Sequence, residues 1–207
     1  MHTGTNLFCP PFVPMTEILH EGKVGAASLN VINIGESESR MATLTGERLM
    51  YPGNYMQLKI NKWLVMSDTP YERLTNRDVV YKAFGDVLIA GLGLGMILVP
   101  IAENPVVKSI TVIESSQDVI DLVTSQFPKS EKINVVCADI NDWVSPSRQK
   151  YTTVYFDIWP SICADNYEEM KALHRRYKKY VDYKAGGFMD SWTKNDVKRL
   201  ASEDRYY

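Results

Sequence analysis

An apolar stretch that contains three closely spaced glycines constrains this chain more than any other feature. Residues 87–102 carry no charged side chain, and Gly91, Gly93 and Gly95 lie inside them. The stretch has about sixteen residues, fewer than the roughly 20 that a membrane-spanning helix needs. The pattern instead predicts a buried strand, a glycine turn and the apolar side of a helix, which is how a parallel sheet covered on both faces reads in sequence. We therefore expect no membrane span.

Strand-like and helix-like segments alternate after residue 85. The expected strands cover 86–90, 108–113, 133–137 and 152–156, and the expected helices cover 94–103, 117–127 and 166–183. Beyond the run 186–189 only a fifth strand and one helix fit, so we expect a short C-terminus. This order predicts an α/β fold with a Rossmann-like, doubly wound parallel sheet, whose ligand lies at the carboxyl ends of the strands.

The first 84 residues have a different pattern. Residues 55–60 and 63–66 flank the possible turn Asn61-Lys62, which predicts a β-hairpin, and 36–44 predicts a short helix. The run 68–72 (DTPYE) fits either a lid over an acceptor pocket or an exposed turn. We expect residues 1–84 to be an N-terminal extension that caps the ligand edge of a domain formed by residues 85–207.

Composition excludes several classes of protein. Lys and Arg number 23 and Asp and Glu 25, a net charge of -2 that argues against a dedicated nucleic-acid coat protein. Residues 171–184 are locally basic, which fits a solvated helix face or a contact with a phosphate-bearing acceptor. Three cysteines without a CxxC pair favour a reducing compartment, and no signal-peptide pattern is present, so we expect a cytoplasmic protein. The three histidines are isolated, so we expect no metal site.

The glycine spacing narrows the ligand class. Gly91, Gly93 and Gly95 form G-x-G-x-G after a predicted buried strand, where a backbone without Cβ atoms lets a ligand approach a turn. A dinucleotide fingerprint needs a further glycine at position 96, which is Met96 here. The spacing therefore disfavours NAD and FAD. Taken alone, the glycine spacing fits a turn with only a structural role equally well.

Three acidic residues follow the next three predicted strands. Glu114 ends the second strand, where a carboxylate can accept hydrogen bonds from both hydroxyls of a ribose. Asp139 follows the third strand and is placed to accept from an adenine amine, and Asp157 ends the fourth, facing the reacting end of a ligand. Each one alone fits a solvated strand-end carboxylate equally well. Their order after the glycine turn favours a nucleoside site.

Four segments together resemble class I S-adenosylmethionine-dependent methyltransferases. They are DVLIAGLGLG, ITVIESSQDVI, VVCADINDW and YTTVYFDIWP, and the resemblance covers about the last 120 residues. It implies that the glycine loop lines the methionine portion of the cofactor, Glu114 the ribose, Asp139 the adenine and Asp157 the reaction centre. The implied cofactor-binding residues are Gly91, Leu92, Gly93, Gly95, Glu114, Ser115, Asp139, Ile140 and Asp157.

Within that superfamily the chain is most similar to the spermidine synthase branch. A hairpin precedes the glycine motif, VIESSQDVI follows it, and FDIWP carries the aspartate at the catalytic position. Two departures weigh against a diamine acceptor. The glycine motif contains no aspartate, and Ile158, Trp159 and Pro160 replace the D-x-x-D-P pattern that supplies a second carboxylate.

The resemblance implies a methyltransferase that uses S-adenosylmethionine. Asp157 is the expected catalytic residue, which orients a nucleophile or takes its proton, and Trp159 with Pro160 forms a wall for the acceptor. The alternatives are an aminopropyltransferase that uses decarboxylated S-adenosylmethionine and a non-catalytic cofactor-binding protein. A small-molecule acceptor is expected, nucleic acid and protein acceptors stay open, and the sequence does not indicate the oligomeric state.

Overall fold

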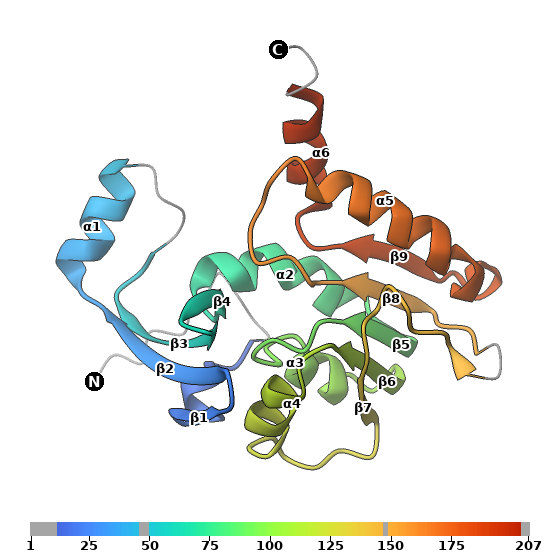
Figure 1. Cartoon of the computed structure of the whole chain (residues 1–207), viewed down its shortest axis with the longest axis horizontal. Helices are drawn as coiled ribbons and strands as arrows, with labels where there is room; N and C mark the ends of the chain where they lie inside the picture. The colour runs from blue at the N-terminus through green and yellow to red at the C-terminus, as the bar shows by residue number, and fades with distance from the viewer. Residues whose placement is uncertain (1–11, 46–49, 147–148, 204–207) are drawn as a thin grey trace.

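The computed structural model describes residues 12–45, 50–146 and 149–203, which form two sheets (Figure 1). One is a four-stranded antiparallel sheet in the order β1-β2-β3-β4, and the other is a five-stranded parallel sheet in the order β7-β6-β5-β8-β9. Figure 1 shows the antiparallel sheet to one side of the parallel sheet, with α1 projecting away from both.

The parallel sheet and its helices confirm the predicted α/β fold. Its elements are β5 (Gly85–Ala90), α3 (Leu98–Glu103), β6 (Val107–Glu114), α4 (Gln117–Thr124), β7 (Ile133–Cys137), β8 (Thr153–Phe156), α5 (Asn166–Tyr177), β9 (Phe188–Ser191) and α6 (Lys194–Glu203). All the strand pairs in this sheet are parallel. None of the helices in the described ranges combines the length and the apolar character needed to cross a bilayer.

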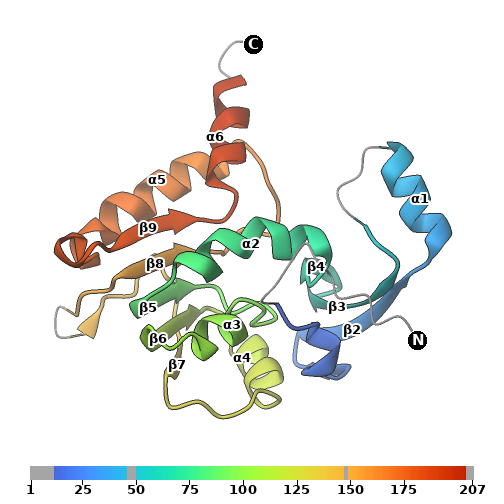
Figure 2. The same cartoon turned by 180° about the vertical axis from the view of Figure 1, so that it is seen from behind.

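The central strand β5 shows why helices cover both faces. Val87 and Ile89 point to one face, where they are buried with α2, α3 and α4, and Figure 2 shows α2 and α3 crossing that face. Leu88 and Ala90 point to the opposite face, where they are buried with α5 and α6. Because successive residues of a strand alternate between faces, the four consecutive apolar residues 87–90 require cover on both faces.

The antiparallel sheet extends the predicted hairpin by two strands. The elements before β5 are β1 (Gly22–Val24), β2 (Ala27–Ile34), α1 (Glu36–Thr45), β3 (Gly53–Ile60), β4 (Trp63–Ser67) and α2 (Pro70–Lys82). Asn61 and Lys62 both have positive φ, as a two-residue hairpin turn requires, so the predicted hairpin is confirmed. The strands β1 and β2 were not predicted.

Apolar side chains join the antiparallel sheet to the parallel one. Leu29, Met56 and Leu58 are buried in the same core cluster as β5. The carboxylate of Asp118 on α4 also accepts a hydrogen bond from the backbone N–H of Ala26, at 2.8 Å. The antiparallel sheet therefore packs directly on the parallel domain, while a boundary at residue 84 stays a prediction.

Three predicted helices are shorter in the structure. The helix predicted at 94–103 begins only at Leu98, since Pro100 lacks the N–H that an interior helical position needs and is tolerated in a first turn. The helix predicted at 117–127 ends at Thr124. The helix predicted at 166–183 ends at Tyr177 and continues as the 3₁₀ turn Lys178–Tyr180.

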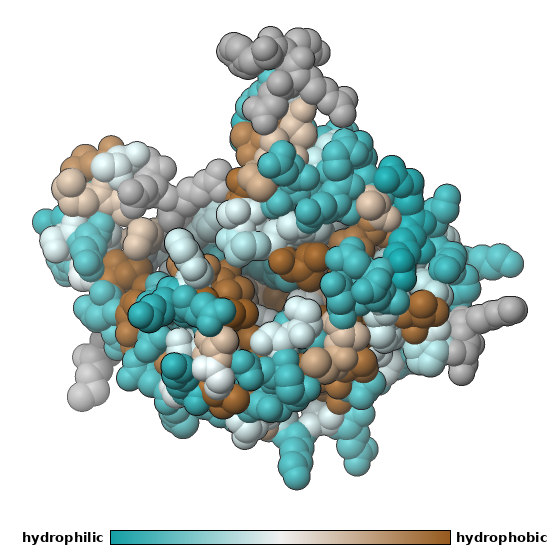
Figure 3. All heavy atoms as spheres, viewed as in Figure 1, coloured by the Kyte–Doolittle hydropathy of each residue, from teal (hydrophilic) through white to brown (hydrophobic). Residues whose placement is uncertain are grey.

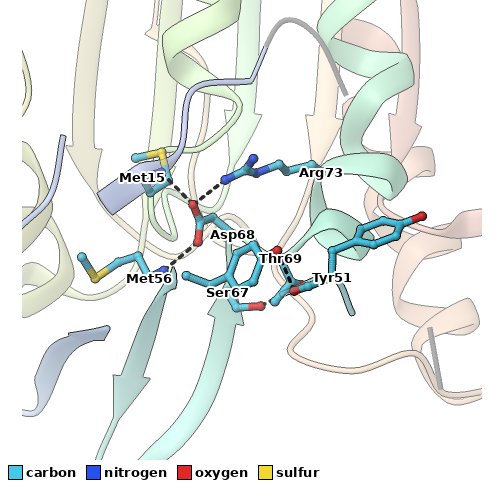
Figure 4. A network of polar contacts seen from close by, with 8 residues as sticks. Met15, Tyr51, Met56, Ser67, Asp68, Thr69 and Arg73 are labelled. Carbon is cyan, nitrogen blue, oxygen red and sulfur yellow. Dashed lines mark hydrogen bonds and ion pairs between the residues drawn. The ribbon is translucent and has the colours of Figure 1, made fainter. Parts of the chain in front are cut away.

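The run 68–72 is not an exposed turn. Asp68 is fully buried and accepts hydrogen bonds from the backbone N–H groups of Met15 and Met56, each at 2.7 Å, and from the Arg73 guanidinium at 2.8 Å (Figure 4). The ion pair lies almost entirely out of solvent. It ties the N-terminal segment and β3 to the first turn of α2, the helix that the sequence analysis missed.

Candidate active site

A cavity of about 330 Å³ lies at the carboxyl ends of the parallel strands, where the antiparallel sheet meets them. The space-filling view shows a hollow near the centre of the face seen in Figure 1, bordered by hydrophobic side chains (Figure 3). The sequence-predicted residues that line the cavity are Gly91, Leu92, Gly93, Glu114, Ser115, Asp139, Ile140, Asp157, Trp159 and Pro160. Its volume is at the lower end of the range typical of small-molecule sites.

Two glycines of the loop after β5 allow a close approach of chain segments. Gly91 has φ 95°, and an added Cβ would overlap the backbone carbonyl oxygen of Asp157. Gly93 has φ 52°, and an added Cβ would overlap the sulfur of Met66, which also accepts a hydrogen bond from the N–H of Leu94 at 3.1 Å. The loop therefore touches both β8 and the hairpin of the antiparallel sheet.

Gly95 differs from the other two glycines. It does not line the cavity, and a Cβ there would overlap the ring of Phe127. Its φ of 69° and its contact with Phe127 give it a packing role. The structure therefore does not bring Gly95 to the place that the resemblance implied.

Glu114 lies at the end of β6 with both carboxylate oxygens oriented by backbone donors. Oε2 accepts from the N–H of Leu92 at 2.9 Å, and Oε1 accepts from the N–H of Ser116 at 2.8 Å. The hydroxyl of Ser115 donates to Oε1 at 3.4 Å. Because each carboxylate oxygen has two lone pairs, Oε2 keeps one free acceptor position, and Oε1 gains one when the rotatable Ser115 hydroxyl turns away, so Glu114 can accept from two ligand hydroxyls. Glu114 thus fixes the glycine loop and also lines the cavity.

Asp139 and Ile140 form the part of the cavity that follows β7. Asp139 Oδ1 accepts from the backbone N–H of Asn141 at 2.8 Å and from its side-chain amide at 3.1 Å. Ile140 is buried, and its carbonyl accepts a hydrogen bond from the hydroxyl of Tyr177 on α5 at 2.6 Å. This part of the cavity therefore offers one acidic edge and one apolar surface.

Asp157 faces a second carboxyl group that the sequence analysis did not identify. Glu72, in the first turn of α2, lines the same cavity. Burial raises the pKa of Asp157 to about 7, and a side-chain hydrogen bond with Asn76 opposes that rise. Burial and the nearby charge of Asp157 raise the pKa of Glu72 to about 8. The two groups therefore change protonation state near neutral pH.

Two tryptophans line the cavity beside these carboxyl groups. Trp159 was predicted and is buried, with its indole N–H donating to Glu169 at 2.8 Å. Trp192 was missed; its N–H donates to the hydroxyl of Thr75 on α2 at 2.9 Å. Since both polar atoms are occupied elsewhere, the two indoles present apolar surface to the cavity.

The cavity is strongly acidic. Its lining includes four carboxyl groups and, among the residues that the structure describes, no lysine, arginine or histidine. The acidic members are Glu72, Glu114, Asp139 and Asp157. The antiparallel sheet adds the apolar side chains Leu58, Ile60, Val65 and Met66. The arrangement suits a ligand that combines positive charge with flat or apolar groups.

No protein-family model matches the chain, and no curated protein matches its sequence. Among solved structures, spermidine synthase from Thermotoga maritima is 10% identical, with a TM-score of 0.51 over 88% of this chain and 63% of its own. The CcbJ methyltransferase from Streptomyces caelestis is 20% identical, with a TM-score of 0.42 over 51% and 41% of the two chains. The plantazolicin methyltransferase BpumL, in complex with a monoazolic desmethylPZN analog and SAH, is 24% identical, with a TM-score of 0.36 over 47% and 35%.

The likeness to the spermidine synthase shows the fold. The two chains share a Rossmann-like α/β fold with a parallel sheet. This chain spans between about a third and two thirds of the length of these proteins.

Proposed function

We propose that this chain is an S-adenosylmethionine-dependent methyltransferase that acts on a small cationic amine. The observation that carries the proposal is the convergence of the glycine loop, Glu114, Asp139 and Asp157 on one cavity at the carboxyl edge of the sheet. A nucleoside ligand of a doubly wound sheet is expected at that edge. The structure of BpumL contains SAH, which supports the cofactor class.

The residues present fit such a cofactor. Gly91 and Gly93 line the cavity, and the positions that their Cβ atoms would take are filled by Asp157 and Met66. Glu114 offers a pre-oriented carboxylate for ribose hydroxyls, and Asp139 with Ile140 offers an acceptor and an apolar surface for adenine. The bound cofactor would supply an activated methyl group on a sulfonium centre.

The chemistry left to the protein is orientation and proton transfer. An ammonium group is attracted by the carboxyl groups of Glu72 and Asp157 and by the faces of the two tryptophans. The Asp157 carboxylate would first take one proton from the ammonium group, which frees the nitrogen lone pair to accept the methyl group that the bound cofactor would supply, with the bonding electron pair left on sulfur. Asp157 is therefore the proposed catalytic residue, and Glu72 an acceptor-binding residue.

A specific observation favours aminopropyl transfer as the second candidate. S-adenosylmethionine carries a carboxylate, and no described residue of the cavity lining supplies a cation to pair with it. Decarboxylated S-adenosylmethionine lacks that group and suits an acidic cavity better. The sequence analysis weighed against a diamine because a second carboxylate was missing after Asp157, and Glu72 now supplies one from α2.

A calorimetric titration tests these proposals. The purified chain is titrated with S-adenosylmethionine, S-adenosylhomocysteine, decarboxylated S-adenosylmethionine and NADH. Methyl transfer predicts tight binding of the first two and weaker binding of the decarboxylated compound, whereas the reverse order supports aminopropyl transfer. Cofactor binding that persists in Asp157→Asn, with no product from any amine in the wild type, would indicate a non-catalytic binding protein. No binding of any compound would refute the cofactor site.

A further inference from the structure

The side chain of Met66 covers part of the glycine loop where that loop meets the cavity. Met66 lies on β4, and its Sδ accepts a hydrogen bond from the backbone N–H of Leu94 at 3.1 Å. The same sulfur fills the position that a Cβ on Gly93 would take. Met66 and Gly93 both line the cavity, so the thioether occupies space beside the loop that a ligand would otherwise reach.

A β-bulge directs Met66 toward the loop. In the pairing of β3 with β4, Leu58 is opposite Met66 and Lys59 is opposite Leu64, so Val65 is an extra residue of β4. Successive residues of a regular strand point to opposite faces, yet Val65 and Met66 both line the cavity. Bulges re-aim side chains in this way beside functional sites. The fold therefore places this sulfur at the loop by a specific local feature.

Most N–H groups of the glycine loop already have acceptors. Apart from that of Leu94, they donate as follows: Gly91 to the Ile113 carbonyl at 2.9 Å, Leu92 to the Glu114 carboxylate at 2.9 Å and Gly95 to the Leu92 carbonyl at 2.8 Å. Among the described residues, the N–H of Gly93 finds no acceptor. While Met66 keeps its position, an anionic ligand group therefore meets one free donor at this loop.

A carboxylate is the group that distinguishes the two candidate cofactors. S-adenosylmethionine carries it on the portion that the glycine loop is expected to line, and decarboxylated S-adenosylmethionine lacks it. No described residue of the cavity lining supplies a cation for that carboxylate, so backbone N–H groups have to bind it. The N–H of Leu94 is held by a thioether, which is a weak acceptor. A carboxylated cofactor has to displace Met66 to reach this donor, and a decarboxylated one does not.

We propose that Met66 is a specificity-determining residue that disfavours the carboxylate of the cofactor. It occupies both the N–H of Leu94 and the space beside Gly93. Methionine is unbranched and has several rotatable bonds, so its side chain can leave the loop without a change in β4. Methyl transfer from S-adenosylmethionine requires that movement, whereas aminopropyl transfer leaves Met66 in place. The inference rests on the proposed function, because it takes the ligand to be one of these two cofactors.

The test compares ligands that differ by the carboxylate alone. S-adenosylmethionine is paired with its decarboxylated form, and S-adenosylhomocysteine with decarboxylated S-adenosylhomocysteine, and calorimetric titration gives the ratio of the two Kd values in each pair. A loss of folded protein affects both members equally and leaves the ratio unchanged. In Met66→Ala the N–H of Leu94 is free for the carboxylate, so we expect the carboxylated member to gain about tenfold in affinity relative to its partner. An unchanged ratio in both pairs would overturn the proposal.

Val65→Ala is the matched control. It removes methyl groups from the cavity wall at the neighbouring position of β4 and keeps the hydrogen bond between Met66 and Leu94. We expect the two Kd values of each pair to change together in this variant. A shift of the ratio equal to that of Met66→Ala would show that cavity size governs the selection, and it would refute the role of the Leu94 donor.

A measurement on the wild type does not depend on the folding of any variant. The amide proton of Leu94, observed by ¹⁵N-correlated NMR, exchanges a sulfur acceptor for a carboxylate only when a carboxylated ligand binds. We therefore expect its signal at lower field with S-adenosylhomocysteine than with decarboxylated S-adenosylhomocysteine. Signals at the same position in the two complexes would contradict the displacement of Met66. Failure of all four ligands to bind would be a different result, because it refutes the proposed cofactor site as well as this inference.

Discussion

Removal of the Glu114 carboxylate is the most direct perturbation of the proposed cofactor site. In Glu114→Ala, two ribose hydroxyls lose a charged acceptor, each worth about 1.5–3 kcal/mol. The low end of the sum, about 3 kcal/mol, corresponds to about a 150-fold rise in Kd. We therefore expect S-adenosylmethionine and S-adenosylhomocysteine to bind at least about 100-fold more weakly.

The same substitution also disturbs the free protein. The N–H of Leu92 donates to Glu114 at 2.9 Å, and this partly buried donor loses its partner. An unsatisfied buried donor costs about 1–3 kcal/mol, which lowers the Tm of a chain of this size by about 2–12 °C. Glu114→Gln, which keeps one acceptor oxygen, should lose less stability and still lose affinity.

Calorimetric titration gives the Kd, and thermal unfolding by circular dichroism gives the Tm. Asp121→Ala is the matched control, because this exposed carboxylate on α4 contacts Gln117 outside the cavity. Wild-type affinity in a folded Glu114→Ala protein would refute the placement of the ribose at β6.

Three further perturbations test the cavity and its supports. Gly91→Ala forces a side chain into positive φ and onto the Asp157 carbonyl, so we expect a loss of more than about 2 kcal/mol in denaturant unfolding, and wild-type stability would contradict this. The raised pKa of Glu72 means that the native state keeps a proton that the unfolded state releases, so stability falls as pH rises from about 4.5 to about 8. Glu72→Gln should reduce the slope of Tm against pH in this range. An unchanged slope would argue against a raised pKa of Glu72. Asp68→Asn breaks a buried ion pair and should cost about 3–5 kcal/mol in denaturant unfolding, whereas a loss below about 1 kcal/mol would show that the network is weak.

The part of the cavity lined by the glycine loop and the three strand-end carboxylates could be predicted from the sequence. The reason is that the carboxyl ends of parallel strands lie at one edge of the sheet. Residues 87–90 of β5 are all apolar and buried, so this strand must be central, and the residues after β5, β6, β7 and β8 then meet at one edge. Acidic residues at three of those strand ends were therefore expected to converge without any knowledge of loop geometry. Gly95 was misplaced because spacing alone does not distinguish a glycine that faces a ligand from one that faces Phe127.

Helix α2 was missed because its buried face is not apolar. The inward positions include Arg73 and Asn76, which read as polar in a search for hydrophobic periodicity. Both are buried because they have specific partners, Asp68 for the arginine and Tyr155 for the asparagine. Partners so distant in sequence leave no local signal, although Pro70 at the helix start and Val79-Val80 near its end were usable hints.

The part of the cavity that we propose binds the acceptor depends largely on helix α2. α2 carries Glu72 into the cavity, anchors Trp192 through Thr75 and binds the Tyr155 hydroxyl through Asn76. Glu72, Thr75, Asn76 and Trp192 all lie outside the four segments that resemble methyltransferases. If those segments hold the cofactor, as we propose, the charge and shape beside the reacting group depend largely on α2 and its neighbours, which lie outside them. Changes on α2 should therefore alter the acceptor before they alter the cofactor.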